Sequence, residues 1–222
     1  MEKQSTQPAL VTLTDPRSAV SEAYRTLRTN LEFTAMSSAL RALVVTTPGA
    51  GEGKSTTLAN LAVTMAQGGR TVILVDADLR RPAQHTIFGS ANERGLSTTL
   101  LDDAGIQNPP LLDTSVPGLR LLPAGPTPPN PAELLASPRM LQLIETLKDM
   151  ADLVLFDAPP VVPVTDAAIL GARTDGVLLV LQAGKSKREH AARARTLLEQ
   201  VGARIIGTAL TNARVDSELG GY

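Results

Sequence analysis

The chain contains no cysteine and no tryptophan, and aromatic residues make up only 2% of its 222 residues. Without cysteine there can be no disulfide and no cysteine-ligated metal, and a cytoplasmic location is expected. The formal net charge is −1, so the chain lacks the overall basic field that favours nucleic acid as a partner. No apolar run is long enough to span a membrane, and the first residues lack the apolar core of a signal peptide. Any association with a membrane is therefore expected to go through a partner.

The stretch PGAGEGKSTT, residues 48–57, is the most informative part of the sequence. It lies between a strand-like apolar run at 42–45 and a helix-like run at 58–65, which is the context of a phosphate-binding P-loop. Its glycines let backbone N–H groups converge on phosphate oxygens, and the start of the helix adds a partial positive charge. Pro48 stands where the usual pattern has its first glycine.

We predict that this P-loop binds a nucleoside triphosphate. The expected binding residues are Gly49, Ala50, Gly51, Glu52, Gly53, Lys54, Ser55 and Thr56. Lys54 is predicted to reach the β- and γ-phosphates, and the hydroxyl of Ser55 to ligate Mg²⁺. The alternative is a glycine-rich turn that caps a helix and binds nothing, and the strand-loop-helix context argues against it.

The fold class follows from the alternation of strands and helices along the chain. Buried apolar runs at 71–75, 153–157 and 176–181 and a strand at 204–210 alternate with helix-like segments. Strands joined by single helices form right-handed βαβ units of a parallel sheet. We predict one α/β domain over residues 1–222, a doubly wound, mostly parallel sheet in three α/β/α layers. Less regular structure is expected over 95–130, with a short strand at 119–122, and helices over 131–150 and 186–201.

The ends of the chain are predicted to differ from its centre. Residues 1–14 are interpreted as a flexible leader and residues 213–222 as a short flexible tail. Asp15 is expected to cap a helix over about 15–38, with an apolar stripe on one face. Glu22, Arg25 and Arg28 recur on the other face. They form either a solvated face with local ion pairs or a face that docks on a neighbouring subunit.

Three aspartates follow buried strands, as carboxylates near a P-loop should. Asp157 ends one apolar run in the manner of a Walker B motif, and Asp76 and Asp78 follow another. Ligands of parallel sheets bind beyond the carboxyl ends of the strands, so these side chains are expected beside the phosphate loop. One carboxylate can organise Mg²⁺ while another accepts the proton of an attacking hydroxyl or water. For each aspartate the alternative is a cap on the following helix.

Other polar residues carry weaker signals. His85 and His190 lack metal-ligand spacing and are interpreted as surface residues. The basic residues between Lys185 and Arg195 are interpreted as a solvated helix face, in preference to a nucleic-acid patch.

Several further stretches carry a family resemblance. They are SEAYRTLRTN at 21–30, VDADLRRP at 75–82, LPAG at 122–125, PNPAELL at 129–135, FDAPP at 156–160 and VTDA at 164–167. Together with the P-loop, they make the chain resemble the bacterial tyrosine kinases (BY-kinases) of capsule and exopolysaccharide synthesis. The related ParA/MinD-type ATPases share the fold but carry a signature lysine where this chain has Gly49, which favours the kinase branch.

The resemblance implies an ATP- and Mg²⁺-dependent tyrosine autokinase that acts in trans within a ring-like homo-oligomer. It implies a transmembrane co-polymerase as partner and a location at the inner face of the membrane. The implied roles are catalysis by Lys54, Asp76 and Asp78, with Asp78 as base; metal binding by Ser55, Asp76 and Asp157; adenine recognition by Asn212; and oligomerisation through Glu22, Arg25 and Arg28.

The C-terminus departs from the family pattern. Members of the family usually end in several tyrosines, whereas this chain has only Tyr222 there. Either Tyr222 is a minimal phospho-acceptor, or the tyrosine cluster was lost or cut away. Two other functions therefore stay open at this point. One is a non-kinase ATPase switch bound to a membrane co-polymerase, and the other is a nucleotide-binding scaffold without turnover.

Overall fold

The computed structural model of the chain describes residues 10–37, 39–102 and 104–213. Within these ranges one sheet has the strand order β3-β4-β2-β5-β1-β6-β7. The strands are β1 (Ala42–Thr46), β2 (Val72–Asp76), β3 (Leu112–Asp113), β4 (Leu119–Leu122), β5 (Leu153–Asp157), β6 (Gly176–Gln182) and β7 (Ile205–Thr211). Neighbouring strands are parallel except for the pair β3–β4. The prediction of a mostly parallel sheet is confirmed.

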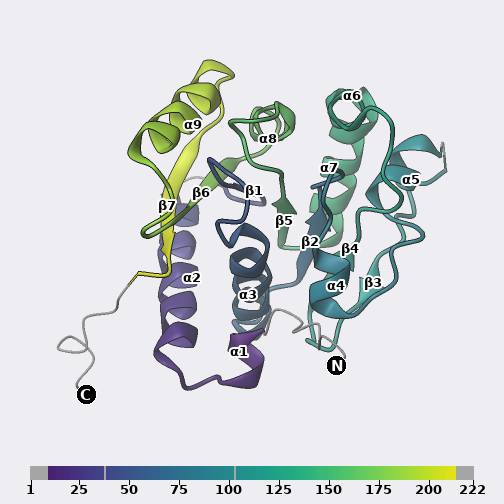
Figure 1. Cartoon of the computed structure of the whole chain (residues 1–222). Coiled ribbons are helices and arrows are strands. Elements are labelled where there is room, and N and C mark those ends of the chain that lie inside the picture. The colour runs from purple at the N-terminus through teal and green to yellow at the C-terminus, as the bar shows by residue number, and fades with distance from the viewer. Residues whose placement is uncertain (1–9, 38, 103, 214–222) are drawn as a thin grey trace, which may run out of the picture.

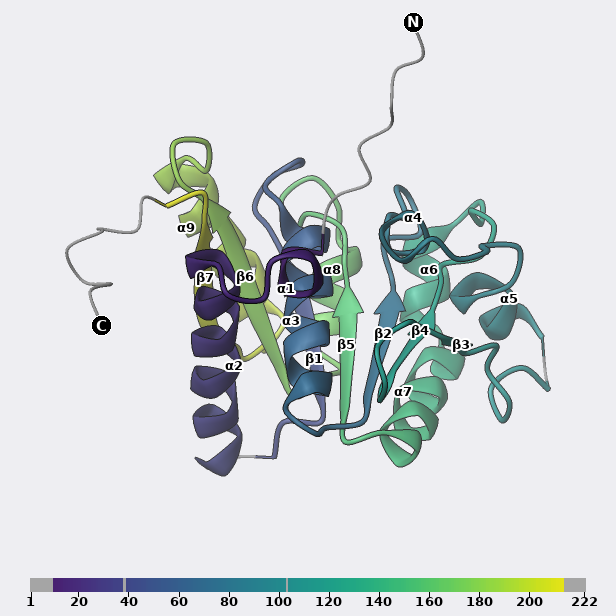
Figure 2. The ribbon, with the colours of Figure 1, turned by 90° about the horizontal axis from the view of Figure 1, so that it is seen from below.

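Helices cover both faces of the sheet, which confirms the predicted three layers (Figures 1 and 2). The layer on one face contains α1 (Val11–Thr14), α2 (Ala19–Ser37) and α3 (Lys54–Gln67). The layer on the other face contains α5 (Leu96–Leu101), α6 (Pro131–Ala136), α7 (Pro138–Met150), α8 (Asp166–Gly171) and α9 (Arg188–Gln200). The short helix α4 (Gln84–Phe88) follows β2 and contacts α3.

The core explains why the central strands are apolar at every position. In β1, Ala42 and Val44 belong to the core on one side of the sheet, and Leu43 and Val45 to the core on the other. Successive side chains of a strand point to opposite faces, and both faces here are covered by helices. Full burial of one such aliphatic side chain contributes about 1.5–3 kcal/mol. This packing holds the carboxyl ends of β1, β2 and β5 at one edge of the sheet.

Part of the predicted leader is ordered. Residues 11–14 form α1, where a flexible segment was expected. Thr12 is buried, and its N–H and hydroxyl donate to Oδ1 of Asn60 at 3.1 and 2.9 Å. Nδ2 of Asn60 in turn donates to the main-chain oxygen of Thr56 at 2.9 Å. A four-residue helix has no periodicity to detect, so only its contacts with α3 reveal it.

Two predicted helix boundaries were wrong. The helix expected from Asp15 begins at Ala19, and the hydroxyl of Ser18 accepts from the N–H of Ser21 at 3.2 Å. The single helix expected over 131–150 is divided into α6 and α7, because Pro138 begins a new helix that the hydroxyl of Ser137 caps.

We predict that Asn60→Ala lowers the free energy of unfolding by about 1–3 kcal/mol, because it leaves the buried donors of Thr12 unpaired. Urea unfolding followed by circular dichroism measures the change. The control is Thr14→Ala, which removes an exposed hydroxyl bonded only to the main-chain oxygen of Leu10. That control is expected to stay within about 0.5 kcal/mol of the wild type. Equal stability of the Asn60 variant and the wild type would contradict the docking of α1.

Candidate active site

The P-loop connects β1 to α3 and surrounds a pocket of about 270 Å³. Gly51 and Gly53 have φ of +71° and +82°, a region where a side chain would strain the backbone. The pocket is lined by Thr47, Ala50, Gly51, Glu52, Gly53, Lys54, Ser55, Thr56, Asp78, Arg81 and Pro160. The predicted phosphate-binding residues therefore converge on one pocket, except that Gly49 is not part of its lining.

Donors outside the loop hold its carbonyl oxygens. The hydroxyl of Thr47 donates to the oxygen of Gly49 at 2.8 Å, and that of Thr211 to the oxygen of Glu52 at 3.3 Å. The ammonium of Lys185, in the segment between β6 and α9, donates to the oxygen of Gly51 at 2.6 Å. Carbonyls engaged from outside leave the N–H groups of the loop free to form a concave anion site.

Lys185 is exposed, as predicted, but it lies before α9 and contacts the P-loop, so it does not belong to the face of that helix. It lies 134 residues from Gly51 in the sequence, and no local pattern marks the contact. Asn212 directly follows Thr211 at the end of β7, where it is exposed and has φ of +53°. It thus lies next to the residue that contacts the loop, and its role toward adenine stays a prediction.

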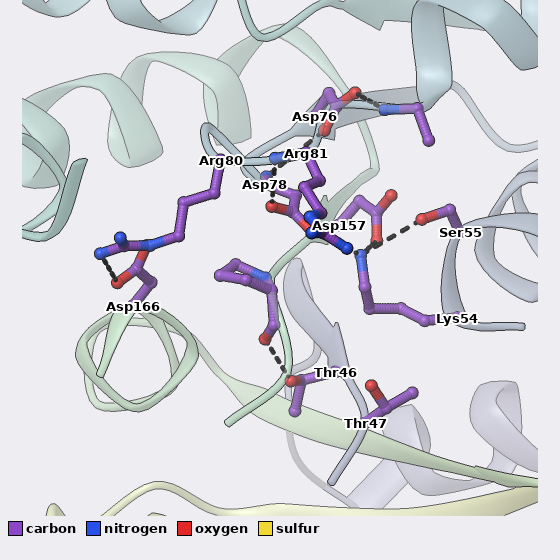
Figure 3. Close-up of polar contacts among 12 residues, drawn as sticks. Thr46, Thr47, Lys54, Ser55, Asp76, Asp78, Arg80, Arg81, Asp157 and Asp166 are labelled. Carbon is purple, nitrogen blue, oxygen red and sulfur yellow. Dashed lines mark hydrogen bonds and ion pairs between the residues drawn. The ribbon is translucent and has the colours of Figure 1, made fainter. Parts of the chain in front are cut away.

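Lys54 and the predicted carboxylates come together in a buried cluster (Figure 3). The ammonium of Lys54 forms ion pairs with Asp157 and with Asp78, the latter at 3.4 Å, and lies 3.2 Å from the hydroxyl of Ser55. Burial alone would lower the pKa of Lys54, but the charges of Asp157 and Asp78 outweigh it, so the pKa is raised. Lys54 therefore stays charged inside the cluster.

Asp76 is fully buried and serves partly as a cap. One carboxylate oxygen accepts from the N–H groups of Ala83 and Gln84, both at 2.9 Å, and the other from the N–H of Asp78 at 3.3 Å. The capping alternative is thus realised at the start of α4. Burial, followed by the charge of Asp157, raises the pKa of Asp76 to about 8.

Asp78 lies at the pocket itself. One of its oxygens accepts from the N–H of Arg81 at 3.0 Å, and the other faces Lys54. Burial raises the pKa of Asp78, although the charge of Lys54 opposes this shift. A carboxylate with a raised pKa is better matched to proton acceptance near neutral pH.

Three nearby residues escaped the sequence analysis. The side-chain amide of Gln84 donates to Asp157 at 2.7 Å and to the main-chain oxygen of Ser55 at 3.1 Å. Arg80 pairs with the buried Asp166 of α8 through two contacts of 2.9 and 3.0 Å. Arg81 is exposed and lines the pocket. The two arginines are adjacent in sequence, and of the two only Arg81 lines the pocket.

The donor set fits Mg²⁺ bound together with phosphate. Among residues 10–37, 39–102 and 104–213, no group of three or more His, Cys, Asp or Glu side chains is arranged to hold a metal ion. Mg²⁺ needs no such group, because it keeps several waters and combines one or two carboxylates with phosphate oxygens. Beside the carboxylate of Asp157, Oε1 of Gln84 is buried and has no hydrogen-bond partner in the described part of the chain.

Comparison with known proteins first defines the class. The family described as "CobQ/CobB/MinD/ParA nucleotide binding domain" matches residues 43–217. The chain is 41% identical to the tyrosine-protein kinase YwqD of Bacillus subtilis, over 97% of this chain and 92% of that protein. It is 34% identical to the putative tyrosine-protein kinase CapB of Staphylococcus aureus, over 99% of this chain and 96% of that protein.

A solved structure agrees with this grouping. The kinase domain of the Escherichia coli tyrosine kinase ETK matches with a TM-score of 0.85 and 34% identity, over 94% of this chain and 83% of that one. The chain thus has a nucleotide-binding domain and belongs to the family of bacterial tyrosine-protein kinases, which confirms the resemblance found in the sequence.

The proposed oligomerisation residues have contacts within the chain. Arg25 pairs with Glu22 at 2.7 Å, and both lie on α2. Arg28 instead donates to the main-chain oxygen of Thr64 at 3.0 Å, so it is partly buried against α3. Arg28 therefore does not share the exposed charged face of α2 with Glu22 and Arg25. The role of the three residues between subunits stays a prediction.

Of the two tyrosines, the structure describes only Tyr24. Tyr24 is half-buried and its side chain bonds to that of Thr57. Tyr222 lies outside the described residues.

Where the chain is described, none of its helices has the length and apolar character needed to cross a membrane.

We predict that Lys185→Ala weakens ADP binding by about tenfold, because the loop loses a charged hydrogen bond at Gly51. Fluorescence titration with a labelled ADP measures the dissociation constant. Lys187→Ala is the matched control, since Lys187 is exposed on the same segment and makes no side-chain cap at the start of α9. An equal effect of the two substitutions would show a general charge effect in place of a contact with the loop.

We also predict a pH-dependent stability change for Asp76→Asn, measured by urea unfolding in EDTA. The folded pKa of Asp76 is raised from 3.8 to about 8, so stability is fully present below the ordinary pKa and is lost as the pH rises through about 8. Asn does not ionise, so the Asp76→Asn variant does not lose stability in this way as the pH rises. Its stability relative to the wild type should therefore increase between about pH 5 and pH 8, on the order of 3 kcal/mol.

Asp152→Asn is the control for this experiment. Hydrogen bonds from Thr71 lower the pKa of Asp152, so its contribution is lost only as the pH falls below the ordinary range. Its effect should be constant between about pH 5 and pH 8. A constant effect of Asp76→Asn over the same range would refute the raised pKa.

Proposed function

We propose that this chain is an ATP- and Mg²⁺-dependent protein-tyrosine kinase that phosphorylates a second copy of itself. One observation carries the proposal: Asp78, a buried carboxyl with a raised pKa, lines the phosphate pocket directly beside Lys54. The carboxyl of Asp78, the ammonium of Lys54 and the P-loop thus surround one pocket, which a hydroxyl nucleophile can approach. The family of tyrosine-protein kinases supports tyrosine as that nucleophile.

Binding of the triphosphate would use the loop and Lys54. The N–H groups of the loop would surround the phosphates, and Lys54 would exchange its ion pair with Asp157 for phosphate oxygens. Ser55 and Asp157 would then face the cation, and Asp76, whose two oxygens both accept main-chain N–H groups, would lie beside it. When bound, Mg²⁺ neutralises charge on the β- and γ-phosphates and orients them for transfer.

The phosphoryl group is transferred by a displacement at the γ-phosphorus. The tyrosine oxygen forms a bond to the γ-phosphorus while the bond from that phosphorus to the β–γ bridging oxygen breaks, and ADP leaves. The proton of the tyrosine hydroxyl goes to the carboxylate of Asp78. Lys54 and the loop amides stabilise the charge that develops on the transferred group.

Arg81 extends this site. Its guanidinium lines the pocket, whereas that of Arg80 is bound to the buried Asp166. Arg81 is therefore available to the transferred phosphoryl group, and Arg80 holds the segment after β2 against α8 (Figure 3).

The cellular role is proposed from the family resemblance. Tyr222 of one subunit would enter the site of the next in a ring that Glu22, Arg25 and Arg28 help to form. The chain would be cytoplasmic, reach the membrane through a transmembrane co-polymerase, and regulate capsule or exopolysaccharide synthesis and export. An ATPase switch on the same partner is the alternative, because Asp78 can equally accept a proton from water.

The direct test is incubation with ATP and Mg²⁺, followed by mass spectrometry of the intact chain and its C-terminal peptide. We predict one phosphoryl group on Tyr222, and a decrease of about a hundredfold or more in its rate for Lys54→Met. Tyr222→Phe distinguishes this acceptor from Tyr24. Phosphate release from an unmodified chain would refute the kinase assignment and favour the ATPase switch.

A further inference from the structure

Gln84 connects the three segments that carry the proposed metal-binding residues. It is the first residue of α4, and its side chain is fully buried. Its side-chain amide bonds to Asp157 at the end of β5 and to the main chain of Ser55 at the start of α3. Its main-chain N–H bonds to Asp76 at the end of β2. Lys54 also connects these segments, through its ion pairs with Asp157 and with Asp78 after β2.

The orientation of this amide is determined by its partners. A carboxylate oxygen and a main-chain carbonyl oxygen can only accept hydrogen bonds, so the NH₂ group must face both. The carbonyl oxygen of the amide then points elsewhere, and it is buried without a hydrogen-bond partner among the described residues. A polar atom left in this state is costly unless something at the site donates to it.

The carboxyl groups around Gln84 need hydrogen-bond donors, and the NH₂ group of Gln84 is one of them. Asp76 and Asp157 are directly opposite each other on the neighbouring strands β2 and β5, and both side chains are fully buried. Two carboxyl groups at opposed positions repel when both are ionised. The amide of Gln84 satisfies one oxygen of Asp157, and the other oxygen pairs with Lys54.

We propose that Gln84 is a positioning residue for the divalent cation of the nucleotide site. Its NH₂ group holds the carboxylate of Asp157 at a fixed place relative to the main chain of Ser55. Groups that orient metal ligands in this way commonly contribute 10–100-fold to metal affinity, so the loss is expected to be about tenfold or more. The inference rests on the proposed Mg²⁺-nucleotide site and assigns that site a residue outside the P-loop and the strand-end aspartates.

The test uses Gln84→Met, which keeps the length of the side chain and removes both polar atoms. The main-chain bond to Asp76 remains in any variant. Mn²⁺ is titrated into the full chain saturated with ADP, and free Mn²⁺ is followed by electron paramagnetic resonance. We expect the dissociation constant of Mn²⁺ to rise about tenfold. The dissociation constant of a labelled ADP in EDTA should change less than about twofold, since the loop amides are untouched.

Two further variants make the result specific. Gln84→Glu preserves the shape but replaces the donor with an acceptor opposite Asp157, so it should lose at least as much Mn²⁺ affinity as Gln84→Met. It also covers the case in which the Met variant fails to fold. Thr86→Ala is the control on the same helix. Among the described residues its exposed hydroxyl contacts only the adjacent His85, so this variant should bind Mn²⁺ like the wild type.

The outcomes separate this inference from the proposed function. Wild-type Mn²⁺ affinity in both Gln84 variants would overturn the positioning role alone. An equal loss of ADP affinity in EDTA would also overturn it, since Gln84 would then support the loop and not the cation site. Failure of the wild-type chain to bind Mn²⁺ with ADP would overturn the proposed Mg²⁺-nucleotide site itself.

Discussion

The site depends on the ion pairs that one buried ammonium, that of Lys54, makes with carboxylates at strand ends. The sheet order places β5 between β1 and β2, so Asp157 lies opposite Asp76 and close to the P-loop that follows β1. Removing these charges from water is expensive unless each is paired and hydrogen-bonded. Lys54 balances Asp157 and Asp78, whereas Asp76 is satisfied by main-chain N–H groups. Such unfavourable crowding is typical of functional sites.

This arrangement couples two binding events. In the proposed site, phosphate groups would compete with Asp157 and Asp78 for the ammonium of Lys54. Once the ammonium contacts phosphate, these carboxylates would lose their counter-charge and bind a cation more favourably. Nucleotide and metal should therefore bind with positive coupling, each increasing the affinity for the other by the same factor. During this proposed exchange the bond from Gln84 would keep Asp157 in place, and the bonds from Lys185 and Thr211 would hold the carbonyl oxygens of the loop.

The sequence predicts what is encoded locally. Residues 48–57 and the aspartates after apolar runs identify the class, because their meaning depends on neighbours along the chain. Gln84, Lys185 and the pair Arg80–Asp166 could not be predicted, since their roles arise from contacts across the fold. The docking of Thr12 on Asn60 is hidden for the same reason. The break between α6 and α7 could have been predicted from the sequence. Pro138 has no N–H to donate within a continuous helix, so a helix boundary is expected there.

The most direct test of the account is a crystal structure of the chain with a non-hydrolysable ATP analogue and Mg²⁺. We expect the ammonium of Lys54 to leave Asp157 and to contact the β- and γ-phosphates. Asp157 should then hold the cation or one of its waters and keep its bond to Gln84. A structure in which Lys54 stays paired with Asp157 and Asp78, while the loop amides alone hold the phosphates, would contradict it.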